Sequence, residues 1–341
     1  PDLTLFLTSF AMLFLELALI RWVSTEVRVF AYLMNLVLLA CFIGIGLGSF
    51  LSQKKIHLCI TFICVSVLVL CTMLPLSITF GEYSLHPFRD IPIYLAAFED
   101  TVIHYQYTVK NLRFFQALGI IATMFLFFLT LFTFVPMGQL IGRVFQESPK
   151  TIQAYSVNVL ASLLGAWAFS GVCFFYAPPW LWLCISIVLT AGIVVLLKDF
   201  SKRNIISILL SLVVIGYMVA DITNVNKNGL TIWTPYQKLT VRPIHPVPNS
   251  VEDPYAGYEQ KSIAGYMMDV NNVGFMNMLN LSDYFRDYYS VYFQRQPIYS
   301  GEAPGWRNAF NFPFSIMEDP SSALILGAGA GNDASAAIRN N

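Results

Sequence analysis

Long apolar stretches restrict most strongly what this chain can fold into. A helix needs about 20 mainly apolar residues to cross the hydrocarbon core of a bilayer, and runs of that kind recur along the first two thirds of the chain. They give seven candidate spans, of which the last two are the shortest: residues 3–22, 29–51, 58–80, 114–135, 154–176, 179–197 and 205–220. The sequence therefore predicts a polytopic α-helical membrane domain over residues 1–222, with the lipid bilayer as its surroundings.

Composition and charge narrow the class further. Hydrophobic residues make up 56% of the chain and charged residues only 12%, whereas an ordinary soluble domain is about 25% charged. The 20 basic and 20 acidic side chains cancel, so no nucleic-acid partner is expected. All six cysteines fall inside predicted spans without a CxxC pair, and the four histidines show no zinc-ligand spacing. We expect free thiols and no metal site.

The composition changes after Asp221, where long apolar runs give way to Asn, Pro, Tyr and Asp. This change predicts a small, water-facing, β-rich domain over residues 223–300. Within this domain the sequence predicts two strands, at 231–241 and 262–269, and a hairpin turn at 271–274. Residues 282–294 are predicted to form either an amphipathic helix or an aromatic-rich segment that covers the sheet.

The last segment has the pattern of a nucleotide-binding unit. An apolar run at 322–326 predicts a buried strand, a glycine-rich turn follows at 327–333, and 334–339 predicts a helix. Residues 301–341 would thus begin a Rossmann-like α/β fold, with Asn332 or Asp333 at the helix N-cap. A plain tight turn between strand and helix is the alternative. The candidate cofactor-binding residues are Gly327, Gly329, Gly331, Asn332 and Asp333.

Three segments together resemble a known family. They are FLELALIR at 14–21 with GIGLGS at 44–49, TPYQKLTV at 234–241, and the glycine turn at 327–333. The chain resembles the membrane-bound spermidine-synthase-like proteins, in which a helical membrane domain precedes a small β domain and a class I S-adenosylmethionine-dependent transferase fold. The resemblance implies S-adenosylmethionine or its decarboxylated form at the glycine turn, a polyamine-like nucleophile under the β domain, and a bacterial inner membrane location.

Substrate residues are less well defined. Tyr236, Gln237 and Asp269 are the candidates for lining such a site, against the alternatives of a strand aromatic and a plain turn aspartate. The Asp-Gly-x-x-Gln segment and the Asp-Glu pair of soluble aminopropyltransferases are absent, so amine selectivity does not carry over. The ribose-holding and catalytic acids would follow Asn341, so no catalytic residue is assigned. We expect a longer protein, or a partner that completes the fold.

Glu16 is the outlier inside the first span, where an ionised carboxylate is costly without a partner or water. Two interpretations stay open: a substrate or proton site, or a buried residue that bonds a polar group on another helix, with Asn35, Gln139 or Asn158 as candidates. Arg21 and Trp22 are predicted to mark the membrane interface.

Glycine spacing makes a separate prediction about packing. Gly44 and Gly48, and likewise Gly138 and Gly142, lie four residues apart inside apolar runs. Residues at this spacing share a helix face, and glycine there lets two helices approach closely. Packing is the expected role of all four.

Two sequence signals disagree about the side of the membrane on which the soluble domain lies. Basic loop residues follow the second, fourth and sixth spans, namely Lys54, Lys55, Arg143, Lys150, Lys198, Lys202 and Arg203. The positive-inside rule makes this face cytoplasmic, and seven spans then place the domain outside, where S-adenosylmethionine is not expected. Either one short segment, 179–197 or 205–220, does not cross, or the glycine turn serves something else.

Three functions therefore compete. The first is a membrane-anchored aminopropyl- or methyltransferase. The second is a non-enzymatic subunit of a larger membrane assembly or homo-oligomer, with a truncated or degenerate transferase part. The third is a small-solute transporter acting near Glu16, although no inverted repeat of broken spans is apparent.

Overall fold

The computed structural model divides the chain into two compact units. Residues 1–224 and 232–238 form the first unit, and residues 225–231 and 239–341 form the second. The structure describes residues 2–27, 29–30, 33–80, 83–96, 112–225, 229–244, 263, 265–280, 316, 322, 324–326, 329 and 331–339.

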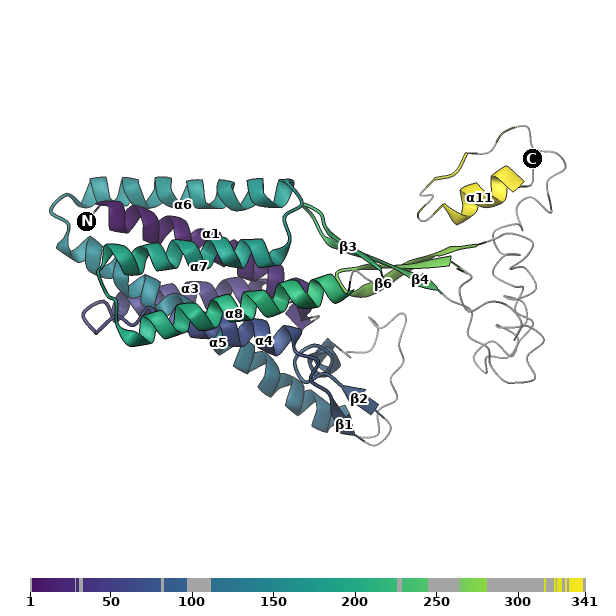
Figure 1. Ribbon diagram of the computed structural model, residues 1–341, viewed down its shortest axis with the longest axis horizontal. Coiled ribbons are helices and arrows are strands. Elements are labelled where there is room, and N and C mark those ends of the chain that lie inside the picture. Colours follow the sequence, from purple (N-terminus) through teal and green to yellow (C-terminus); the bar gives the residue numbers. More distant parts are fainter. Residues whose placement is uncertain are drawn as a thin grey trace. The chain divides into compact units, whose positions relative to one another are not determined.

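The first unit is a helical bundle (Figure 1). Within the described residues, five of its helices are long and apolar enough to cross a membrane, and two apolar helices are shorter. A bundle with so many lipid-length apolar helices is an integral membrane domain. The helices are α1 (Asp2–Glu26), α3 (Met34–Phe50), α4 (Cys59–Met73), α5 (Leu112–Glu147), α6 (Thr151–Phe174), α7 (Pro179–Leu196) and α8 (Lys202–Val225).

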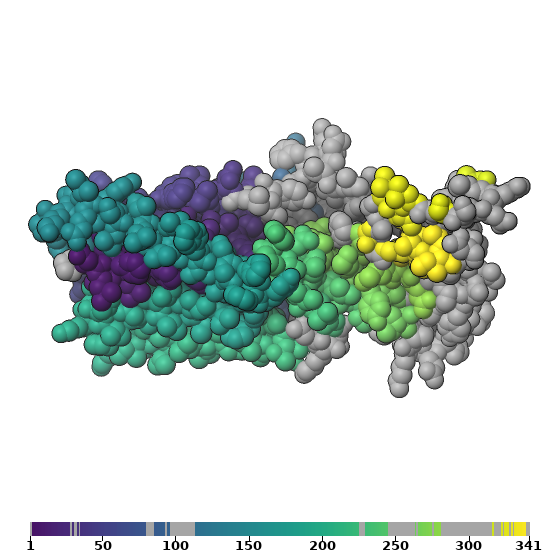
Figure 2. Space-filling view, turned by 90° about the horizontal axis from the view of Figure 1, so that it is seen from above, coloured from purple at the N-terminus to yellow at the C-terminus, as the bar shows by residue number. Residues whose placement is uncertain are grey.

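Helix α1 lies inside this bundle, packed between α6 and α7. Most of its residues are buried, and on the face shown in Figure 2 it appears as a dark purple patch bordered by later helices. The contact with α6 is close, because a Cβ at Gly165 would come within 2.5 Å of the Phe10 carbonyl oxygen. Ser9 Oγ also donates a 2.7 Å hydrogen bond to Asn158 Oδ1 across the two helices.

The glycine pairs pack α3 against α5, as their spacing predicts. A Cβ at Gly44 or Gly48 would lie 2.3 Å from a backbone oxygen of α5, and one at Gly138 would lie 2.4 Å from the Ile45 oxygen of α3. A Cβ at Gly142 would come within 2.9 Å of Ser49 Cα. At each of these contacts a glycine of one helix therefore lies directly against the backbone of the other helix.

Helix lengths differ from the prediction in one respect. The shortest apolar helices are Asn35–Phe50 and Cys59–Met73, whereas the sequence pointed to the last two spans. Helix α4 ends early because the residue before Pro75 avoids the helical region, and Leu74 has an extended ψ of 137°. The apolar residues that follow form β1 (Ile78–Phe80), which pairs with β2 (Tyr83–Leu85) before a short 3-10 helix, η1 (Ile91–Ala96).

A four-stranded sheet follows α8, in the order β3-β4-β5-β6. The predicted strand 231–241 is two strands, separated by a turn at 234–237, and β6 was not predicted. Asn271 and Asn272 form the predicted hairpin turn with φ of 49° and 62°, the left-handed pair that a two-residue turn needs. The region 282–294 lies outside the described residues. The strands are β3 (Leu230–Trp233), β4 (Lys238–Ile244), β5 (Gly265–Val270) and β6 (Val273–Leu279).

Candidate functional site

The glycine turn leads into helix α11 (Asn332–Arg339). Gly329 and Gly331 have φ of 54° and 82°, left-handed values at which a side chain strains the backbone. A Cβ added at Gly331 would meet nothing within 4 Å, so the space beside this residue is open. Gly327 lies outside the described residues.

The N-cap of α11 is Gly331 rather than Asn332 or Asp333. Its carbonyl accepts the first helical hydrogen bond, 2.9 Å from Ser335 N, and this acceptor defines the cap. Asn332 instead ties the helix to β6: its Oδ1 accepts from Leu279 N at 3.0 Å, and its Nδ2 donates to the Asn277 carbonyl at 2.7 Å. Asp333 is exposed in the first turn, so it is the side chain left to meet a ligand.

The segment before the turn, which is predicted to be a buried strand, is not one where the structure describes it. Among the described residues of 322–326 none is in a strand, and the side chains of Leu324 and Leu326 are 87% and 85% exposed. A strand is held by hydrogen bonds to a neighbouring strand and by burial of its apolar face. These residues have neither in the described part of the chain.

Asp269 lies in β5 as part of a charge pair. Its side chain is buried, and its Oδ2 accepts a hydrogen bond from Nη2 of Arg242 on β4. The pairing registers of β5 and β6 shift next to it, between Met268 and Asp269. A carboxylate already bonded to a guanidinium has less capacity left for an amine substrate.

Tyr236 and Gln237 sit in the turn between β3 and β4. The Tyr236 side chain is 92% exposed, and Thr234 holds the turn together by accepting at Oγ1 from the backbone N–H groups of Tyr236 and Gln237. This turn belongs to the helical unit, whereas Asp269 and the glycine turn belong to the second unit. Tyr236 and Gln237 are therefore neighbours in one turn of the first unit.

An arginine packed against two tryptophans anchors this turn, and sequence reasoning missed it. The Arg21 guanidinium lies 4.8 Å from the ring centre of Trp182 and 5.9 Å from that of Trp233, and it donates to the Thr234 carbonyl. Trp22 stacks on Trp233 at 5.9 Å. Arg21 and Trp22, which are predicted to mark the membrane interface, pack against this hairpin at the end of the bundle, and Trp22 is fully buried.

Charged residues extend the same anchor. The buried Glu26 carboxylate pairs with Lys238 Nζ at 2.9 Å and with Arg89 Nη2 at 4.0 Å. Lys238 also lies 5.4 Å from the Trp233 ring centre. Residues from α1, the α4–α5 connection and the hairpin thus meet at one end of the bundle.

Glu16 lies inside the bundle with its side chain buried, near Cys41 of α3. None of the predicted partners bonds it: Asn158 accepts from Ser9, and Gln139 donates to the Leu51 carbonyl at 3.2 Å. Asn35 is exposed. Within the described residues no hydrogen bond to the Glu16 carboxyl is formed.

Replacing Glu16 by leucine should therefore leave the bundle at least as stable. A buried polar group without a partner costs about 1–3 kcal/mol, and leucine removes that cost at similar volume. Thermal unfolding of Glu16→Leu and Glu16→Gln in the same detergent tests this. A clear loss of stability in the leucine variant alone would instead reveal a bonding partner for the carboxyl group.

No metal site appears among the described residues. They contain no group of three or more His, Cys, Asp or Glu side chains placed to hold a metal ion, and their six cysteines are all free, as predicted. Comparison with protein-family models, with curated proteins and with solved structures finds no match.

Proposed function

We propose that this chain belongs to a membrane-anchored, S-adenosylmethionine-type transferase of the spermidine-synthase-like kind. The observation that carries the proposal is the glycine turn. Gly329 and Gly331 adopt left-handed backbone before α11, and the space at Gly331 is open. A turn of this shape before a helix N-terminus suits the close approach of a nucleotide-type ligand.

The residues divide the work as follows. The open backbone at Gly331 binds the ligand, and the exposed Asp333 carboxylate is the side chain of α11 nearest the turn that is free to contact it. The Asn332 amide positions the turn by fixing α11 to β6. When bound, the sulfonium supplies an electrophilic carbon, and catalysis then requires mainly alignment of the attacking group.

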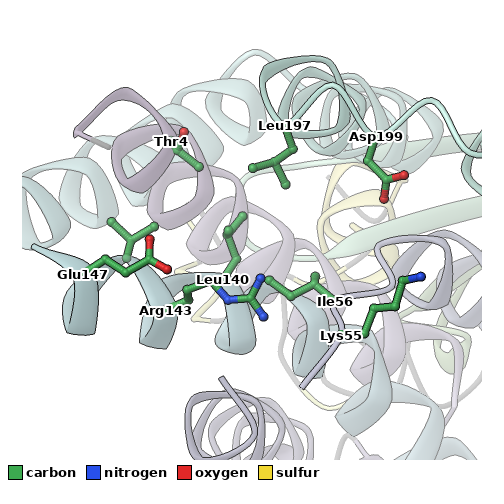
Figure 3. A pocket seen from close by; sticks show the side chains of 9 residues that line it. Thr4, Lys55, Ile56, Leu140, Arg143, Glu147, Leu197 and Asp199 are labelled. Atoms are coloured by element: carbon green, nitrogen blue, oxygen red, sulfur yellow. The ribbon is translucent and has the colours of Figure 1, made fainter. Parts of the chain in front are cut away.

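Seven membrane crossings belong to the same proposal, with bacterial inner membrane as its location. The ends of the helices support an alternating path. One cavity at the start of α1 is lined by residues from four separate places in the chain (Figure 3). They are Thr4 in α1, Lys55 in the α3–α4 connection, Glu147 at the end of α5 and Leu197 after α7. The far end of α1 contacts Arg89 and the 233–238 hairpin. With seven crossings, the hairpin end of the bundle lies on the side of the bilayer opposite the basic loops.

The proposal predicts cofactor binding by the full-length gene product. Calorimetric titration with S-adenosylmethionine and with its decarboxylated form should show one of them binding in the micromolar range, about −8 kcal/mol. Gly329→Val should abolish binding, because valine is strained at positive φ and narrows the turn. Asp333→Asn keeps the shape of the side chain but removes its charge beside the turn, so a smaller loss of binding is expected. Circular dichroism controls for folding, and an absence of binding to the folded wild-type protein overturns the proposal.

A non-enzymatic subunit is the second candidate, and one observation favours it. Leu324 and Leu326 are exposed next to the glycine turn, and adjacent exposed leucines are typical of a surface that another chain covers. Size determination of the full-length protein in mild detergent distinguishes the two. A stable hetero-complex without cofactor binding identifies the subunit, whereas binding by the isolated protein identifies the enzyme.

A further inference from the structure

A cavity of about 570 Å³ opens at the end of the helical bundle where α1 begins (Figure 3). It lies between the start of α1, the end of α5, and the connections α3–α4 and α7–α8. Its wall is partly aliphatic and partly charged. The lining residues are Thr4, Lys55, Ile56, Leu140, Arg143, Val144, Glu147, Leu197 and Asp199.

The charges in this cavity are balanced and unpaired. Lys55 and Arg143 are cationic, and Glu147 and Asp199 are anionic. Among the described residues no ion pair joins any of the four to another side chain. Two charges of each sign therefore face one cavity without neutralising each other, which suits a ligand that carries both signs.

Arg143 is held in place by backbone groups rather than by acids. Its Nε and Nη2 donate to the Ser52 carbonyl at 3.1 and 2.8 Å, and Nη2 also donates to the Lys54 carbonyl at 2.7 Å. These bonds fix the guanidinium plane while its Nη1 side remains available. A fixed guanidinium beside a lysine is a typical binding site for a phosphate group.

We propose that this cavity binds the zwitterionic headgroup of a bilayer lipid, one that carries a phosphodiester and a primary ammonium group. Lys55 and Arg143 bind the phosphate, and Asp199 and Glu147 accept hydrogen bonds from the ammonium group. Ile56, Leu140 and Leu197 contact the aliphatic part of the molecule next to the headgroup. The cavity lies at the ends of membrane helices, among the seven basic residues of the connecting loops, where lipid headgroups are found.

Lipid competition tests the chemistry of the headgroup. Native mass spectrometry of the delipidated protein compares phosphatidylethanolamine, phosphatidylglycerol and phosphatidylcholine with identical acyl chains. We expect phosphatidylethanolamine to bind about tenfold tighter than the other two, since one lacks the ammonium group and the other cannot donate an N–H. Equal binding of phosphatidylglycerol overturns the proposal in favour of a general cationic patch. Equal affinity for soluble O-phosphoethanolamine overturns the lipid as the source.

Neighbouring lysines provide a matched control for the site itself. Lys55 lines the cavity and Lys54 does not, although both are exposed. Lys55→Met should weaken phosphatidylethanolamine binding about tenfold, whereas Lys54→Met should leave it unchanged. Asp199→Asn should remove the preference over phosphatidylglycerol without lowering phosphatidylglycerol binding. Equal effects of Lys55→Met and Lys54→Met, or an unchanged preference in Asp199→Asn, would place the lipid elsewhere.

Discussion

Gly138→Val should separate α3 from α5 and strongly destabilise the bundle. A Cβ at this position would lie 2.4 Å from the Ile45 carbonyl oxygen and 2.9 Å from Ile45 Cα, so the two backbones must move apart. Overpacking of this kind costs about 1–3 kcal/mol and more where backbone has to shift. The expected result is a large loss in thermal stability in detergent and in the yield of monodisperse protein.

Gly46 offers the control for this substitution. It lies in α3 between Gly44 and Gly48, yet a Cβ there would meet nothing within 4 Å. Gly46→Val makes the same change in side chain within a helix, so both variants carry a similar intrinsic helix cost. Similar stability losses for Gly138→Val and Gly46→Val would show that the two helices do not pack through their glycines.

Trp233→Ala should release the β3–β4 turn from the bundle. The Trp233 side chain is 5% exposed, stacks on Trp22 and meets Trp182 edge-on at 5.3 Å. Truncating a buried tryptophan costs about 3–5 kcal/mol, and the cation of Arg21 loses one of its two aromatic partners. Hydrogen exchange should increase in residues 233–238, together with a lower unfolding temperature.

Tyr236 is the matched aromatic for this experiment, since it lies in the same turn with its side chain almost fully exposed. Tyr236→Ala removes a ring that packs on nothing in the described residues, so stability and exchange should stay unchanged. If the two variants behave alike, the turn is not anchored through Trp233.

Most features of the helical domain could be predicted from the length of the apolar runs and from the spacing of the glycines. Both signals are local: a run of about 20 apolar residues predicts a span wherever it occurs, and two glycines four residues apart predict a close helix contact. The end of α4 was mispredicted, because residues 78–80 are as apolar as the helix before them. Pro75 was the signal that separates the two.

The anchor of the hairpin could not be predicted in the same way. Arg21, Trp182 and Trp233 are far apart in the sequence, and only the folded bundle brings them together. Each alone looks like an interfacial residue of a membrane protein. Similarly, the role of Asn332 depends on bonds to β6, a strand whose mixed Met, Phe and Asn composition gives no clear alternation.

Cysteine labelling tests the central claim most directly, namely a membrane domain whose hairpin end and basic-loop end lie on opposite sides of a bilayer. Ser201→Cys lies in the α7–α8 connection, and Tyr236→Cys lies in the exposed turn between β3 and β4. Both are introduced into a protein without its native cysteines and treated in sealed vesicles with a membrane-impermeant maleimide. The account predicts that the two positions react from opposite sides; reaction of both from the same side would contradict it.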